Sequence, residues 1–150
     1  MISWVPLQVR KVAQTKVGSR GNCFEACVAT LTGQPIEAVP VFAESNDDQR
    51  PYLARLDQWL VGLGLRVVTL NRGDCPPDDR VPDYIGADTF WIAGLETSDA
   101  DYHHAVVMRG SELYWDPEGA VDLASWPDLL HRVRAVTLLV TAASGPDDER

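Results

Sequence analysis

The stretch GNCFEACVATLTG, residues 21–33, combines a helix start, an apolar run and a helix end. Asn22 is of a type that favours the position before the first helical residue, and Gly33 is of the type that follows the last. The apolar side chains between them follow helical spacing and cover nearly every side of the helix. Because such a helix must be buried, the stretch predicts the central helix of the fold, with Cys23 in its first turn.

The rest of the sequence predicts a second long helix and then strands. Residues 51–63 place leucines in one stripe, between a proline suited to a first helical turn and two glycines suited to the end. A short helix is expected from 127 to about 131. Apolar runs predict strands at 4–13, 65–70, 90–95, 105–108, 113–115 and 133–140. Helices that precede mainly antiparallel strands indicate an α+β fold.

Length and composition fit a single globular domain. A chain of 150 residues, 45% of them hydrophobic and 23% charged, can bury a core of its own. We expect one domain over residues 1–143 and a frayed tail at 144–150. Residues 73–88 contain several prolines and aspartates and no periodicity, so they are expected to form a loop, which could act as a flap.

The charge and the apolar pattern exclude some classes of partner. A net charge of -9 at pH 7, with no cluster of Lys and Arg, argues against a nucleic-acid-binding surface. Acidic residues gather between Asp74 and Asp101 and at the C-terminus, where they either solvate loops or steer a basic partner. No run of 18 apolar residues predicts a membrane-spanning helix. The N-terminal residues lack signal-peptide features, and three cysteines suit free thiols in a reducing compartment, so we expect a cytoplasmic protein.

Cys23 has the position of a nucleophile. A thiolate, rather than a thiol, attacks carbonyl carbon, and a helix N-terminus favours the thiolate through its N–H groups and its dipole. Cys27 lies one turn further into the apolar helix and is expected to be a small buried hydrophobic residue. An ordinary core position remains the alternative interpretation of Cys23.

A cysteine nucleophile needs an imidazole base and a polar group that orients it. His103 and His104 begin a valine-rich strand, and because strand side chains alternate, only one of them can face the helix. His131 lies beside arginines and is expected on the surface. Asp116 follows the next strand, so a hairpin would bring its carboxylate close to His104. Asp116 could also serve only as a turn former before the following proline.

Three motifs together resemble the papain-like cysteine peptidases, in particular the branch of the bacteriocin leader peptidases. They are Gly-Asn-Cys-x-x-x-Cys at the start of an apolar helix, a later His-Ala-Val-Val strand, and Trp-Asp-Pro-Glu-Gly. The resemblance extends from about Gln14 to the last strand. It implies a papain-like α+β fold, in which a nucleophile-bearing helix packs on a mainly antiparallel sheet that carries the His and the Asp. It assigns Cys23 as nucleophile, His104 as general base and acid, and Asp116 as the residue that orients the imidazole.

The resemblance also implies an oxyanion hole formed by the backbone N–H of Cys23 and an upstream glutamine. Gln14 is the only glutamine between Val9 and Cys23, and it lies nine positions before the cysteine, farther than is usual in the leader peptidases. Those peptidases are usually fused to a membrane exporter, which this sequence does not contain, so their specificity for double-glycine leaders is not carried over. Free-standing small proteins with a similar helix occur in bacteria and phages.

The sequence therefore predicts a cysteine hydrolase that acts on a peptide or protein substrate through an acyl-enzyme, without a cofactor. An acyltransferase with the same three residues and a non-catalytic peptide-binding or immunity module are the alternatives. A metal site built from Cys23, Cys27, His103 and His104 is disfavoured, because structural zinc prefers cysteines on a turn with a later matching pair. The oligomeric state is left open.

Overall fold

Within the described residues, two α-helices precede five strands, which is the expected order except for the strand predicted at 4–13. The computed structural model describes residues 7–16, 21–41, 49–71, 85–97, 103–119 and 129–141. The elements are α1 (Cys23–Thr32), the 3-10 helix η1 (Ile36–Ala38), α2 (Gln49–Val61), β1 (Leu65–Asn71), β2 (Phe90–Glu96), β3 (His103–Arg109), β4 (Glu112–Trp115), the 3-10 helix η3 (Leu130–Arg132) and β5 (Val133–Thr141). The expected α+β fold is confirmed.

The five strands form one antiparallel sheet in the order β1-β5-β2-β3-β4. β2 and β3 pair along their whole length, so that His104 lies opposite Leu95. β4 is shorter and pairs only with residues 107–109 of β3. Among the described strands, none pairs with the start of β3 on that side, which leaves this part of the sheet edge open to contact with α1.

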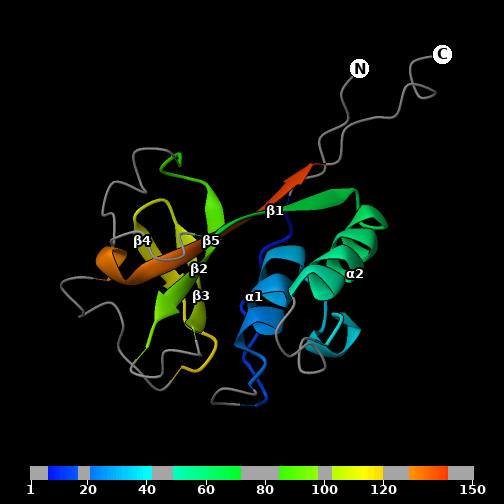
Figure 1. Cartoon of the computed structure of the whole chain (residues 1–150), viewed down its shortest axis with the longest axis horizontal. Helices are drawn as coiled ribbons and strands as arrows, with labels where there is room; N and C mark the ends of the chain where they lie inside the picture. The colour runs from blue at the N-terminus through cyan, green and yellow to red at the C-terminus, as the bar shows by residue number, and fades with distance from the viewer. Residues whose placement is uncertain are drawn as a thin grey trace.

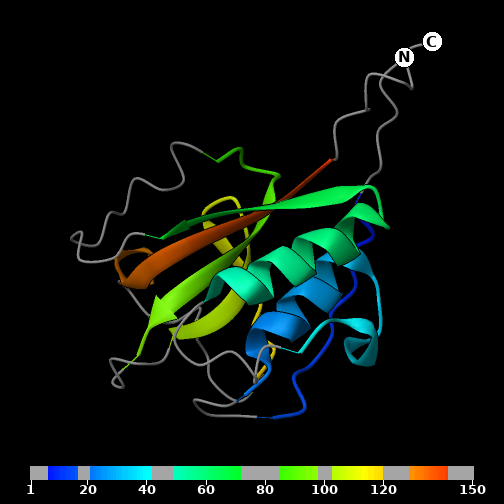
Figure 2. The ribbon, with the colours of Figure 1, turned by 45° about the vertical axis from the view of Figure 1, so that its right-hand side comes forward.

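Both α-helices lie on the same face of the sheet (Figure 1), and Figure 2 shows them side by side in front of the strands. The core between helices and sheet includes Leu31 of α1, Leu56 of α2 and Ile92 of β2. A second core covers the opposite face, where Trp91 and Met108 are buried. The alternation of strand side chains explains this division, because neighbouring residues of one strand point to opposite faces.

α1 ends as the sequence predicts. Gly33 follows the last helical residue in the left-handed conformation, with a φ of 69°, which glycine adopts without steric cost. A side chain at this position would also collide with the chain that passes alongside, because a Cβ on Gly33 would lie 2.5 Å from the carbonyl oxygen of Gln8. The glycine therefore both ends the helix and admits the N-terminal segment.

The expected strand at 4–13 is wrong for the described residues 7–13, which belong to no strand. Their backbone forms no strand ladder; it bonds to α1 and, at the Val12 carbonyl, to the Trp115 side chain of β4. The Arg10 N–H donates to the Thr30 carbonyl at 2.8 Å, and the Val12 N–H donates to the Thr30 hydroxyl at 3.0 Å. Since the last carbonyls of a helix have no partner within it, an extended segment can satisfy one of them in this way.

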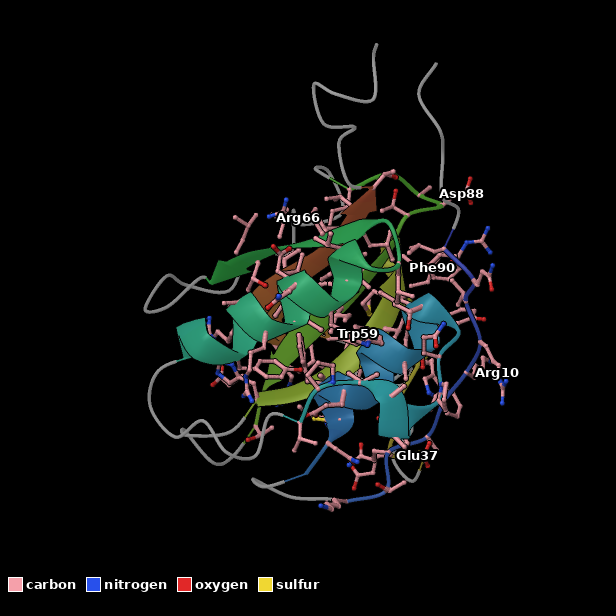
Figure 3. The ribbon with its side chains drawn as sticks, turned by 90° about the vertical axis from the view of Figure 1, so that its right-hand side faces the viewer. Arg10, Glu37, Trp59, Arg66, Asp88 and Phe90 are labelled. Carbon is pink, nitrogen blue, oxygen red and sulfur yellow. The ribbon has the colours of Figure 1, made fainter. Side chains whose placement is uncertain are left out.

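A polar contact joins α2 to the sheet. Arg66, labelled on β1 in Figure 3, forms an ion pair of 2.7 Å with Asp57 of α2. The second oxygen of Asp57 accepts the Val67 N–H at 3.0 Å. These contacts fix the turn between α2 and β1. α2 ends at Val61, two residues before the expected helix end at residue 63.

Some expectations concern parts of the chain outside the described residues. They are most of the loop at 73–88, the tail at 144–150 and the start of the short helix expected at 127–131. Within the described part of the latter, Leu130–Arg132 form a 3-10 helix. No helix in the described ranges is long and apolar enough to cross a membrane.

Candidate active site

Cys23 is the first residue of α1, and the preceding loop is fastened to this end of the helix. Asn22 occupies the predicted cap position, but its side chain makes no capping bond to the helix. Its carboxamide oxygen instead accepts the N–H groups of Thr15 and Lys16, both at 2.9 Å, and its nitrogen donates to the Thr15 hydroxyl at 2.7 Å. The predicted helix start at Asn22 is therefore confirmed. The Asn22 side chain, however, bonds to Thr15 and Lys16 and not to the N–H groups of the helix.

The sulfur of Cys23 lies against the start of β3. The Ala105 N–H donates to it across 3.4 Å. This N–H is available because β4 pairs with β3 only from Val107 onward. Cys23 has an exposed fraction of 5%, so it is buried beside the sheet but not fully enclosed.

His104 is hydrogen-bonded to a carboxylate and to the side chain of Cys23. Its Nε2 lies 2.7 Å from Oδ1 of Asp116, and the exposed fractions of the two residues are 8% and 7%. The side chain of Cys23 is the second group that hydrogen-bonds to the ring. His103 points to solvent. The structure thus brings Cys23, His104 and Asp116 together, and of the two neighbouring histidines His104 is buried and His103 exposed.

The pKa of His104 reflects these contacts. Burial alone would lower the pKa, because it disfavours the charged ring. The hydrogen bonds and charges of Asp116 and Cys23 outweigh burial and raise the pKa of His104 to about 9. The two contacts therefore favour the charged form of the His104 ring.

A tight turn presents Asp116 to His104. The Gly119 N–H donates to the Asp116 carbonyl at 3.0 Å, and the Glu118 N–H donates to the carboxylate oxygen Oδ1 at 3.1 Å. The Pro117 carbonyl accepts the Gln14 N–H at 3.0 Å, which ties the turn to the loop before α1. Figure 2 shows this chain after β4, in yellow, reaching the start of α1 in blue.

Gln14 lies close to the site, but its side chain is engaged elsewhere. Its amide nitrogen donates to the Lys16 carbonyl at 2.7 Å, and the same carbonyl accepts the Asn22 N–H at 3.2 Å. The amide oxygen of Gln14 is buried and has no hydrogen-bond partner among the described residues. The loop therefore carries Gln14 to the region just before Cys23 despite the long spacing in sequence.

The structure also reveals a residue that the sequence analysis missed. Oε2 of Glu118 lies 3.9 Å from Nε2 of His104, on the same side of the ring as Asp116. The signal in the sequence was the position of Glu118, two residues after Asp116 across a proline, which places both carboxylates in one turn. The other cysteine of α1, Cys27, is fully buried, and burial raises the pKa of its thiol well above the ordinary value. His131 is exposed, as expected.

In the part of the chain that the structure describes, no group of three or more His, Cys, Asp and Glu side chains is arranged to hold a metal ion. Comparisons with protein-family models, with curated proteins and with solved structures find no match for this chain. The function therefore has to be argued from the geometry of Cys23, His104 and Asp116.

Proposed function

We propose that the protein is a cysteine hydrolase of the papain-like type, which acts on an amide bond of a peptide or protein substrate. The observation that carries the proposal is the buried chain of contacts from Asp116 through the imidazole of His104 to the sulfur of Cys23 at a helix N-terminus. Nucleophile, base and orienting carboxylate in this order are the features by which such a site is recognised on any fold.

The first half of the reaction forms an acyl-enzyme. The Cys23 thiolate attacks the carbonyl carbon, and the carbonyl electron pair moves to the oxygen. That oxyanion would be held by N–H groups of the first turn of α1, which the helix does not use in its own hydrogen bonds. The His104 imidazolium then gives a proton to the leaving nitrogen as the C–N bond breaks, and a thioester remains.

The second half releases the acid. The now neutral His104 removes a proton from water, whose oxygen attacks the thioester carbon, and the thiolate leaves while the imidazolium reforms. Asp116 keeps Nε2 protonated throughout, so that the other ring nitrogen, Nδ1, carries out both proton transfers. Gln14 would join the oxyanion hole only if its amide nitrogen left the Lys16 carbonyl.

Reaction with a thiol reagent tests the proposal independently of the substrate. Iodoacetamide at about pH 6.5 should alkylate Cys23 faster than Cys75, which serves as the internal reference. His104→Ala should slow alkylation of Cys23 at this pH by about tenfold or more, because the thiolate loses its imidazolium. His103→Ala, a neighbouring exposed histidine, is the matched control and should leave the rate unchanged.

A screen of fluorogenic peptides and protein conjugates then tests catalysis itself. Turnover should disappear in Cys23→Ala, and mass spectrometry of the quenched reaction should show an acyl adduct on Cys23. If added amines trap that adduct as new amides, the protein is an acyltransferase rather than a hydrolase. A Cys23 thiol no more reactive than Cys75 would contradict the proposal and favour a peptide-binding module.

A further inference from the structure

The turn after β4 presents two carboxylates to one imidazole. Oδ1 of Asp116 lies 2.7 Å from Nε2 of His104, and Oε2 of Glu118 lies 3.9 Å from the same nitrogen. The two side chains differ in their surroundings, since that of Asp116 has an exposed fraction of 6% and that of Glu118 one of 33%. One acid is therefore fixed in the interior, and the other keeps contact with solvent.

The backbone of the turn fixes the relation between these acids. The Glu118 N–H donates to Oδ1 of Asp116, and the Gly119 N–H closes the turn on the Asp116 carbonyl. Pro117 restricts the backbone between them. The backbone of Glu118 is therefore held beside the carboxylate that contacts Nε2.

Asp116 contacts the His104 ring through a single carboxylate oxygen, Oδ1. Oδ1 receives both the imidazole and the Glu118 N–H, whereas the buried Oδ2 has no hydrogen-bond partner among the described residues. If the bond from Nε2 to Oδ1 opens, the carboxylate of Glu118 is a second acid close to this N–H.

We propose that Glu118 is a second positioning residue for His104, which accepts a hydrogen bond from the Nε2–H group and so keeps the ring charged and oriented when Asp116 does not. Its consequence for catalysis rests on the proposed cysteine hydrolase function. A shift of about 1 Å would bring its carboxylate from 3.9 Å into hydrogen-bond range, and its partial exposure leaves room for that movement.

The groups around His104 determine under which conditions the effect of Glu118 on the ring can be measured. Cys23 approaches from α1, Asp116 and Glu118 come from the turn, and Leu95 on β2 is apolar. His103, the neighbour on β3, is exposed. Asp116 and Cys23 account for the raised pKa of His104 while both are in place. The contribution of Glu118 should therefore emerge when Asp116 is neutralised.

NMR titration of the His104 ring tests this role without requiring activity. We compare the wild type, Glu118→Gln, Asp116→Asn and the double variant. Glu118→Gln should lower the His104 titration midpoint slightly in the wild type and by about one pH unit in the Asp116→Asn background. Glu112→Gln, which removes an exposed carboxylate from β4 of the same hairpin, is the matched control and should leave the midpoint unchanged.

Activity supplies the second readout. The two substitutions should be non-additive, with Glu118→Gln lowering kcat by about tenfold in the Asp116→Asn protein and by less than twofold alone. Equal midpoints for Asp116→Asn and the double variant would overturn the role of Glu118. If Asp116→Asn does not fold, Glu118→Gln alone decides, and a midpoint equal to that of Glu112→Gln overturns the role.

The two proposals fail in different ways. An inactive protein in which Glu118→Gln shifts the His104 midpoint would contradict the hydrolase function and support the positioning role of Glu118. An active protein in which Glu118→Gln does not shift the midpoint would support the hydrolase function and contradict the positioning role.

Discussion

The raised pKa of His104 predicts how the stability of the protein depends on pH. A proton binds the folded state more tightly than the unfolded state when the folded pKa is the higher one. The pKa of His104 rises from 6.5 to about 9 on folding, which corresponds to an upper limit of about 3 kcal/mol at 1.36 kcal/mol per unit. This stabilisation is fully present below pH 6.5 and is lost as the pH rises through 9.

Urea unfolding of the wild type and of His104→Gln, between about pH 6 and pH 9.5, measures the effect. The difference in the free energy of unfolding between the two proteins isolates His104, because the other titrating groups are common to both. We expect this difference to shrink by up to about 3 kcal/mol over that interval. Two curves that run parallel, or a wild type that gains stability relative to the variant as the pH rises, would refute the reasoning.

Three further substitutions test the scaffold around the site. Gly33→Ala should lower the free energy of unfolding by about 2 kcal/mol or more, measured by urea titration, because of the φ of 69° and the contact with Gln8. Thr30→Val should cost about 1 to 3 kcal/mol in the same assay, since the Val12 N–H loses its acceptor. Asn22→Ala should increase hydrogen exchange of the loop amides at 15 and 16 and should leave those of β5 unchanged.

Hydrophobic spacing predicted the main helices and strands because each of them forms by burying an apolar face. The helix from Cys23 to the residue before Gly33 and the strands of the sheet each bury an apolar face, and the sequence shows that face directly. The segment at 7–13 shows the limit of this reasoning. Its alternation indicates one buried side, but its backbone partner is a helix carbonyl at Thr30, which no local pattern specifies.

The meeting of Cys23, His104 and Asp116 was predictable because it follows from two local features. One is a helix that starts at the cysteine, and the other is a hairpin that brings residue 116 to the start of the preceding strand. Simple alternation is less informative, since it places His104 on the face of Val106 and Met108, opposite the helix. The contact with Cys23 is possible because this end of β3 lies at the open edge of the sheet.

The parts of the site that the sequence did not predict depend on the loop before α1 and on the turn after β4. Asn22 was expected to cap the helix, but its carboxamide bonds to Thr15 and Lys16 instead. These contacts bring the segment that contains Gln14 close to the helix start although Gln14 lies nine positions before Cys23. Glu118 was missed because its distance from His104 is set by the geometry of the turn rather than by strand pairing.

The energetics of burial favour a functional role for the three side chains. His104 and Asp116, with exposed fractions of 8% and 7%, lose most of the hydration of their polar groups on folding. Their mutual attraction offsets this loss only when the geometry is good. Apolar residues of similar size often replace such a buried pair with little loss of stability, so the pair is not explained by stability alone. A strongly shifted imidazole beside a thiol at a helix N-terminus is, by contrast, what nucleophilic catalysis requires. Substitution of both residues by apolar ones should therefore abolish the reactivity of Cys23 before it abolishes folding.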